Sequence, residues 1–360
     1  MPDEDPTAAS PGSADTAPAA ILRQALAWKD AAADVALATI VRAWSTAPMR
    51  AGSQMAVRGD GVRFGSLFGP PVDARVAQAA LDVLDRGADP KLGVAVDDAT
   101  ASTAGLACGG ALEIRLEAIT EGDAGHADLL RAALRAIEDR QGVVLCTRLS
   151  DGLRACLPAS GAAAHAWAAE ARDRARADDT GIASVDGDEV LFQVFNAPLR
   201  LFVVGAVRAA RALLDAAKLV GFGVTIIDPR PGHMQAMPFP GARQVVDDAA
   251  RALRDAHLDE RCAVVFLSHA PEIDDPGLAE AIGSRAFYVG ALGSRRTHAA
   301  RLARLAERGH APELTARIHG PAGLRIGAVG PAEIAASIVA EIVAVLRRGD
   351  GGLASSDPSP

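Results

Sequence analysis

The alternation of apolar and polar positions is clearest between residues 201 and 230. A short apolar run, Leu201–Val204, predicts a buried strand that ends at Gly205. Apolar residues then recur with helical spacing from Val207 to Ala217, and a second apolar run, Val224–Ile227, predicts another strand. A strand, a helix and a strand of these lengths form a βαβ unit, so we expect the two strands to be parallel neighbours.

The start of this predicted helix is suited to an anion. It follows Gly205 directly, so its unpaired N–H groups and its dipole point at the turn. Asp228 ends the second strand, where a Rossmann-like fold places its ribose-binding carboxylate. The G-x-G-x-x-G pattern is incomplete, however, because Val207 and Ala210 occupy its second and third glycine positions. The pattern predicts a Rossmann-like fold, and a βαβ unit without a ligand remains the alternative.

The N-terminal part of the chain predicts a mixed α/β domain. Val35–Trp44 has the β-branched content of a strand, and Gln54–Val57 predicts a second strand that turns back as a hairpin at residues 59–61. Pro70 and Pro71 remove two backbone donors, and we expect them to delay the next helix until Val72.

Cys108 is a candidate binding residue in this part of the chain. It is followed by Gly109 and Gly110, where the backbone can approach a ligand closely, and then by an alternating strand. The alternative is a small buried residue at a strand-entry turn. Further along, the alanine-rich run 162–177 predicts a helix, and His165 within it is interpreted as a solvated or packing residue.

Two more strands are predicted in the C-terminal part, Cys262–Ala270 and Ala286–Ser294. His269 stands at the carboxyl end of the first, where open parallel sheets bind ligands. The second leads into a helix and so predicts a second anion-binding helix start, made of Gly293, Ser294, Arg295 and Arg296. A turn-rich loop over residues 231–242 is long enough to cover a site beside Gly205.

Composition limits the class of protein. A chain of 360 residues suits two domains, and a net charge of −8 argues against a general nucleic-acid or anionic-membrane binder. The four cysteines show neither CxxC nor zinc spacing, which is typical of reduced thiols in a cytoplasmic protein. The sequence predicts neither a signal peptide nor a membrane span. The sequence shows no recognisable set of a nucleophile, a general base and a residue that orients the base, which favours a non-catalytic protein.

Taken together, the motifs resemble those of the XdhC/CoxI family, accessory proteins of xanthine and carbon monoxide dehydrogenases. The matching segments are STAPMRAGSQMAV (45–57), GLACGGALEI (105–114), IDPR (227–230), FYVGALGSRRTHAARLARL (287–305) and IHGPAGLRIGAVGPAEIAASIVAEI (318–342). The resemblance implies an α/β protein in which an N-terminal XdhC/CoxI-like domain (21–120) and a connecting region (121–199) precede a Rossmann-like parallel-sheet domain (200–348). Residues 1–20 and 349–360 are predicted to be disordered tails.

The resemblance also implies a function. Family members bind the molybdenum cofactor (molybdopterin), protect it and deliver it to an apo molybdenum hydroxylase. A cysteine desulfurase that sulfurates the cofactor is a further candidate partner, and a homodimer a candidate assembly. In this interpretation the helix starts at Gly205 and Gly293 hold the phosphate end of the cofactor, with Arg208, Asp228 and Arg230 nearby. Cys108 with its two glycines approaches the metal end.

Two departures from the family pattern bear on this interpretation. The family motif SGGCVE corresponds to FGPPVD here, so Pro71 replaces a cysteine and Asp73 stands at the acidic position. Arg208 stands where relatives tend to have histidine. Two alternatives therefore remain open: an NAD(P)-dependent oxidoreductase that uses Gly205 and Asp228, and a divergent interaction protein that no longer binds the cofactor.

Overall fold

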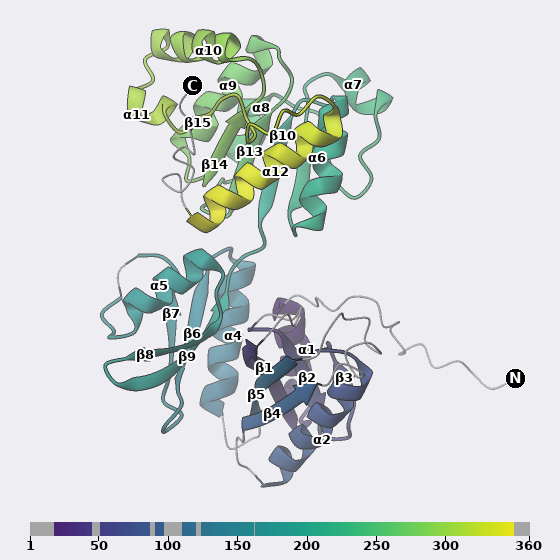
Figure 1. Ribbon diagram of the computed structural model, residues 1–360, viewed down its shortest axis with the longest axis vertical. Helices are drawn as coiled ribbons and strands as arrows, with labels where there is room; N and C mark the ends of the chain where they lie inside the picture. Colours follow the sequence, from purple (N-terminus) through teal and green to yellow (C-terminus); the bar gives the residue numbers. More distant parts are fainter. Residues whose placement is uncertain are drawn as a thin grey trace, which may run out of the picture. The chain divides into compact units, whose positions relative to one another are not determined.

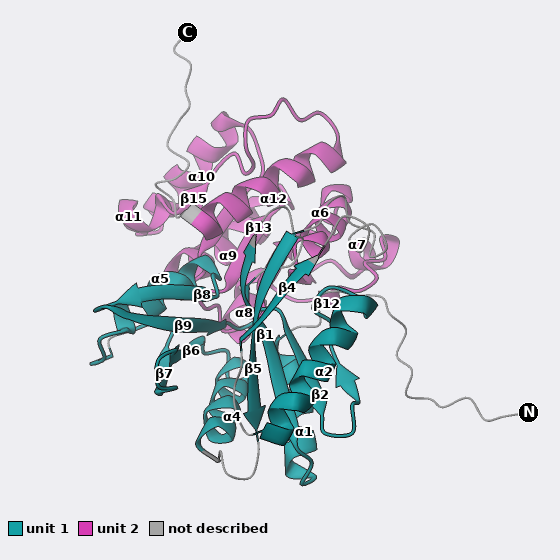
Figure 2. Ribbon diagram, turned by 60° about the horizontal axis from the view of Figure 1, so that its bottom comes forward, with its two compact units in different colours: residues 1–197 teal, residues 198–360 magenta. Residues whose placement is uncertain are grey.

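The computed structural model describes residues 18–44, 51–86, 91–96, 110–119, 124–161 and 163–348 (Figure 1). The chain divides into two compact units, residues 1–197 and residues 198–360 (Figure 2). Most of the two predicted tails, residues 1–17 and 349–360, lies outside the described residues. Each unit has its own strands and its own buried core.

The first unit contains an antiparallel sheet in the order β3-β2-β1-β5-β4. Its strands are β1 (Val35–Trp44), β2 (Gln54–Arg58), β3 (Arg63–Phe64), β4 (Lys91–Val96) and β5 (Gly110–Ile119). Alternating side chains go to opposite faces of this sheet. One face packs on α2 (Pro70–Arg86), and the other packs on α1 (Pro18–Asp30) and α4 (Ala124–Glu138). The predicted hairpin is confirmed, because β2 pairs with β3.

Helix α2 begins at Pro70, two residues before the predicted start. The expectation was wrong because the first turn of a helix needs no intrahelical N–H donors, so prolines are tolerated there. The buried carboxylate of Asp73 organises the preceding loop. It accepts hydrogen bonds from the N–H groups of Leu67 (2.9 Å) and Phe68 (3.1 Å) and from the hydroxyl of Ser66 (2.5 Å).

The segment from 124 to 197 adds a second antiparallel sheet to this unit, in the order β7-β6-β9-β8. Its strands are β6 (Val143–Arg148), β7 (Arg154–Pro158), β8 (Gly181–Val185) and β9 (Asp188–Phe195). Helix α5 (Ala168–Ala177) covers one face. The predicted helix was too long at its start, because the N–H of Trp167 donates to Nδ1 of His165 (3.2 Å) in a turn before α5. The rings of these two residues pack 4.7 Å apart.

The second unit is built on a sheet whose six strands are all parallel, in the order β12-β11-β10-β13-β14-β15. The strands are β10 (Arg200–Val204), β11 (Gly223–Ile227), β12 (Arg243–Val245), β13 (Cys262–Phe266), β14 (Tyr288–Ala291) and β15 (Ile318–His319). Counted from the first strand of the unit, this is the order 3-2-1-4-5-6 of the dinucleotide-binding fold. The predicted Rossmann-like parallel sheet is confirmed.

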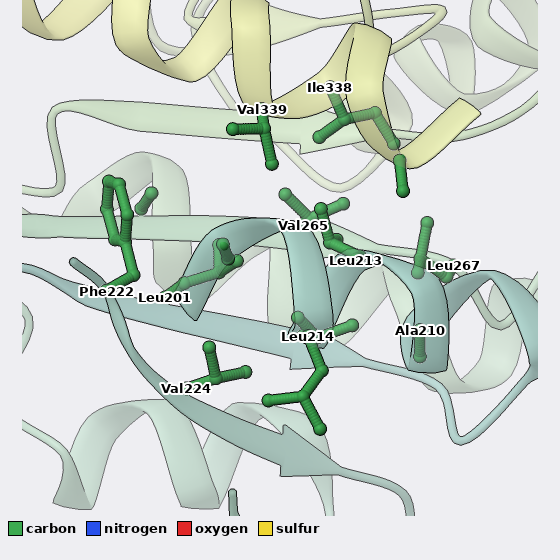
Figure 3. Close-up of a cluster of buried hydrophobic side chains, with 14 of the residues drawn as sticks. Leu201, Ala210, Leu213, Leu214, Phe222, Val224, Val265, Leu267, Ile338 and Val339 are labelled. Carbon is green, nitrogen blue, oxygen red and sulfur yellow. The ribbon is translucent and has the colours of Figure 1, made fainter. Parts of the chain in front are cut away.

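Helices cover both faces of this sheet, which is why its central strands are apolar on both sides. α6 (Arg208–Leu219) and α12 (Pro331–Arg348) pack on one face, where their side chains meet those of β10, β11 and β13 (Figure 3). α8 (Ala249–Asp255), α9 (Pro271–Gly283) and α10 (Arg295–Glu307) pack on the other. Two short helices, α7 (Pro231–Ala236) and α11 (Pro312–Thr315), complete the unit. The predicted loop at 231–242 therefore begins with a helical turn, started by a proline at its first position.

Helix α12 is tied to the sheet by the carboxylate of Glu341. This group accepts hydrogen bonds from the hydroxyl of Tyr288 (2.5 Å) and from the N–H of Gly323 (2.8 Å). Nδ1 of His319 lies 3.7 Å from its other oxygen. Glu341 thus joins the last helix to β14, to β15 and to the loop that follows β15.

Candidate functional site

The turns that follow β10, β11, β13, β14 and β15 all lie at one edge of the second unit, because parallel strands end on the same side. We call this the carboxyl edge. The order of strands reverses between β10 and β13, and ligands of such sheets bind in the crevice outside this crossover point. Gly205 follows β10 there, and Ser268 follows β13 two residues after its last residue.

Gly205 is required by its surroundings. Its φ of +111° belongs to a region that side chains rarely adopt, and an added Cβ would lie only 2.7 Å from the backbone N of Ser268. The two turns are therefore in backbone contact. Helix α6 begins just after, at Arg208, and the residue before it, Val207, makes no side-chain capping bond. The start of α6 therefore lacks a side-chain cap, and its first residue, Arg208, is exposed.

Asp228 closes this turn from the neighbouring strand. Its side chain is 0% exposed and accepts from the N–H of Ala206 (2.7 Å) and from the N–H of Arg230 (2.9 Å). Nε and Nη2 of Arg230 donate to the same carboxylate, each at 2.8 Å. Burial alone raises the pKa of Asp228, but these hydrogen bonds outweigh it and the pKa lies below its ordinary value. The carboxylate of Asp228 thus accepts four hydrogen bonds, whereas the side chain of Arg230 is 34% exposed at the carboxyl edge.

The second predicted helix start has a different construction. Gly293 has a φ of +145°, and Ser294 caps α10 by accepting a hydrogen bond from the N–H of Thr297 (3.1 Å). The hydroxyls of Ser294 and Thr297 also lie 2.9 Å apart. Arg295 and Arg296 are exposed in the first turn. One N–H group at the start of α10 is therefore already bonded to a side chain of the same segment, and the two arginines are exposed to solvent.

A buried charged cluster at the carboxyl edge was not predicted. The hydroxyl of Ser268 donates to the carboxylate of Asp274 (2.6 Å), and Asp275 pairs with Nε (2.6 Å) and Nη2 (2.9 Å) of Arg304. Nη2 of Arg301 donates to the carbonyl of Leu292 (3.1 Å). Burial raises the pKa of Asp274 and lowers that of Arg301. Two adjacent aspartates in an apolar helix, and arginines spaced three residues apart in another, were the sequence signal.

The structure separates the predicted site residues into two groups. Gly205, Arg208, Asp228 and Arg230 gather at the crossover point, and residues 293–296 lie on the same edge, beyond β13. Gly110 belongs to the first unit, where it pairs with Val96 at the start of β5. Cys108 and Gly109 lie outside the described residues.

Two kinds of feature are absent from the described residues. No group of three or more histidine, cysteine, aspartate or glutamate side chains there is arranged to hold a metal ion. Among the same residues, no helix combines the length and apolar character needed to cross a membrane.

Comparison with known protein families identifies both parts of the chain. The model of the XdhC Rossmann domain matches residues 201–342, and the model of the XdhC and CoxI family matches residues 28–92. The chain belongs to the XdhC and CoxI family. The Rossmann-domain match covers every residue that the structure places at the crossover point.

Relatives extend this likeness over most of the chain. The molybdenum cofactor insertion chaperone PaoD of Escherichia coli is 28% identical over 86% of this chain and 82% of its own length. A Bacillus subtilis protein named as a probable subunit of xanthine dehydrogenase is 27% identical over 88% of this chain and 94% of its own. The crystal structure of a Bacillus halodurans protein described as a xanthine dehydrogenase matches with a TM-score of 0.62 and 22% identity, covering 96% of this chain and 98% of that one. This last likeness shows the fold alone.

The family resemblance drawn from the motifs is thereby confirmed. The expectation of an accessory protein rather than an enzyme is confirmed at the same level, by the family and by the chaperone name of PaoD. The roles of the individual site residues remain predictions.

Proposed function

We propose that this protein binds the molybdenum cofactor and delivers it to an apo molybdenum hydroxylase. The observation that carries the proposal is the crossover point of an XdhC-type Rossmann unit, where α6 begins without a side-chain cap beside the exposed Arg208 and the half-buried Arg230. The family and the name of PaoD support the same cargo. A phosphate group is what such a helix start accepts.

The residues at the crossover point fit the phosphate end of the cofactor. An added Cβ at Gly205 would meet backbone, so only glycine leaves the turn intact, and Arg208 adds a positive charge at the first residue of α6. Arg230 presents part of its guanidinium while its other nitrogen atoms hold Asp228. These residues would bind and orient the phosphate; the cofactor itself would supply the dithiolene and the metal.

Binding of the metal end of the cofactor is supported by fewer residues of this chain. The family cysteine is replaced by Pro71, which lies exposed in the first turn of α2 and has neither a thiol nor an N–H. Protection of the metal would therefore depend on other groups, with Cys108 as the sequence-based candidate. Handover in the cytoplasm rests on the cysteine pattern of the sequence, and a cysteine desulfurase partner and a homodimer rest on the family resemblance.

An oxidoreductase that uses NAD(P) is less well supported by the geometry. Recognition of a ribose hydroxyl needs a carboxylate oxygen that is free to accept. Both oxygens of Asp228 already accept hydrogen bonds from Ala206 and Arg230.

The test is retention of the cofactor by the purified protein. The protein is mixed anaerobically with molybdenum cofactor released from a molybdenum hydroxylase, and separately with NAD(H), and bound pterin and nucleotide are quantified after desalting. We expect near-stoichiometric pterin and no nicotinamide, followed by activation of an apo molybdenum hydroxylase when the loaded protein is added. Retained nicotinamide without pterin would overturn the proposal.

A pair of variants ties the result to the site. Arg208→Ala should weaken pterin retention about tenfold, the effect of losing one charged hydrogen bond to a phosphate. Lys218→Ala removes the same charge from the last turn of the same helix and should bind like the unchanged protein. If both variants retain pterin equally well, the phosphate is not held at the start of α6. If neither ligand is retained by the unchanged protein, the divergent interaction protein becomes the better interpretation.

A further inference from the structure

Non-glycine residues with positive φ are uncommon, and most of those described in this structure have an ordinary explanation. They are Ala32, Arg140, Asp178, Asp186, His257 and His269. The first three and His257 stand within two residues of the ends of α1, α4, α5 and α8, where a left-handed residue is common. Asp186 lies in the two-residue turn between β8 and β9, a hairpin position that requires positive φ.

His269 has neither explanation. With a φ of +60°, it stands between the end of β13 and the start of α9, so it precedes a helix rather than following one. Its neighbours hold the turn firmly. The hydroxyl of Ser268 accepts from the N–H of Ala270 (3.1 Å) and donates to Asp274 (2.6 Å). The chain keeps a side chain where glycine would be less strained.

His269 follows β13 at the crossover point, where open parallel sheets bind ligands. Ser268, its immediate neighbour, is in backbone contact with Gly205, so the imidazole is carried by the second of the two turns at the crossover point. The side chain is exposed, while the residues on either side are half buried. The imidazole lies near Asp274, the buried carboxyl at the start of α9.

A second observation indicates the charge of the ligand. Arg301 is 2% exposed, and its Nε and Nη1 have no hydrogen-bond partner among the described residues. Asp275 is matched by Arg304, and Asp274 is hydrogen-bonded to Ser268. The charge of Arg301 acts on both aspartates, but among the described residues no carboxylate forms a hydrogen bond with its guanidinium. Two donors of this buried guanidinium therefore lack an acceptor among the described residues, and an anion at the nearby edge would supply one.

We propose that His269 contacts a phosphoryl group bound at the crossover point, opposite the uncapped start of α6. The identity of the ligand, the phosphate of the molybdenum cofactor, rests on the proposed function. The role of His269 rests on the backbone and on the charges around it. In this interpretation the strained conformation is retained because it directs the imidazole toward the ligand.

The chain offers a matched control in His257, which is also exposed and left-handed, with a φ of +47°. His257 follows α8 and so lies at the opposite, amino edge of the sheet. His269→Gly and His257→Gly should each raise the Tm by about 2 °C, because glycine relieves the positive φ. A lower Tm for His269→Gly alone would show that the residue is not strained and would overturn the inference.

Binding separates the two positions. Pyrophosphate is titrated into the protein, and the imidazole proton signals are followed by NMR, with the signal of His269 assigned by its loss in His269→Asn. We expect pyrophosphate to shift this signal, and His269→Asn to bind about tenfold more weakly while His257→Asn binds like the unchanged protein. Asparagine tolerates the left-handed conformation, so the loss would come from the imidazole. An unshifted signal, or equal affinities for the two variants, would refute the proposal.

The same variants are then tested for pterin retention, so that the two proposals can fail separately. Pyrophosphate that shifts the His269 signal in a protein that retains no pterin would support the role of His269 and reject the cofactor function. Pterin retained equally by His269→Asn and His257→Asn would support the cofactor function and reject the role of His269.

Discussion

The two glycine-marked helix starts of the second unit look alike in sequence and differ in structure. Each has a glycine after a strand and arginine in the first helical turn. At α10, Ser294 caps the helix and its hydroxyl accepts the N–H of Thr297. At α6, Val207 supplies no cap, and Asp228 binds the turn from outside the helix. The difference indicates that the free N–H groups at the start of α6 can donate to an anion. At the start of α10, one of these N–H groups already donates to the side chain of Ser294.

The largest expected effect comes from removing Asp228, which supports the start of α6 from outside the helix. Asp228→Ala leaves the N–H of Ala206 and the guanidinium of Arg230 without their acceptor, and we expect a loss of about 3–5 kcal/mol of unfolding free energy. Urea denaturation measures the change. Asp215→Ala removes an exposed partner of Arg211 in the same unit and should cost less than about 1 kcal/mol. Equal losses in the two variants would contradict this role of Asp228.

The same carboxylate gives a pH dependence. The pKa of Asp228 is lowered in the folded state, so its stabilisation is present above the ordinary carboxyl pKa of about 4 and is lost as the pH falls through the lower folded value. The difference in stability between the unchanged protein and Asp228→Ala should therefore shrink on acidification below pH 4. A difference that stays constant down to acid unfolding would show that the charge of Asp228 contributes little.

Replacing each of the two glycines by alanine should give intermediate losses of stability that differ between the two helix starts. At Gly205 the new Cβ would meet the backbone of Ser268 at 2.7 Å, and backbone cannot move away as a side chain can. At Gly293 it would meet the side chain of Thr297 at 3.1 Å. We expect Gly205→Ala to cost about 3 kcal/mol and Gly293→Ala about 1 kcal/mol, by chemical denaturation. The reverse order would mean that the turn after β10 is not the constrained one.

The smallest effects come from exchanging the caps. Ser294→Ala should cost about 1 kcal/mol, because the N–H of Thr297 loses its acceptor. Val207→Thr is nearly isosteric and offers α6 the cap that it lacks, so it should stabilise the protein by about 0.5 kcal/mol and weaken pyrophosphate binding. Thermal unfolding and the pyrophosphate titration measure the two effects. Tighter binding by Val207→Thr would argue against an anion at this helix start.

Much of the fold was predictable because the second unit follows local rules closely. The apolar runs at Leu201–Val204 and Val224–Ile227 each became buried parallel strands. The start of α2 was misjudged because Pro70 and Pro71 were interpreted as barriers, although a helix tolerates proline in its first turn. The strands β7 and β8 were not predicted, since each is only five residues long and depends on pairing with β6 or β9.

The candidate site was predictable in position and less so in chemistry. The end of β11 identified Asp228, but spacing does not reveal that Arg230 and Ala206 occupy its oxygens. The buried pairing of Asp275 with Arg304 joins residues 29 positions apart, and such contacts exist only in the folded chain. The strain at His269 is a backbone property, which the identity of the residue does not indicate.

The bond between Glu341 and the loop after β15 has a consequence for the order of synthesis. Glu341 stands in α12, which follows every strand of the sheet along the chain, so the hydroxyl of Tyr288 and the N–H of Gly323 gain their acceptor only after α12 has left the ribosome. Until then the loop after β15 lacks this anchor, and α6 lacks the helix that packs beside it. A chain that ends before α12 therefore does not carry a finished carboxyl edge, and ligand binding there reports that α12 has been made and has packed on the sheet.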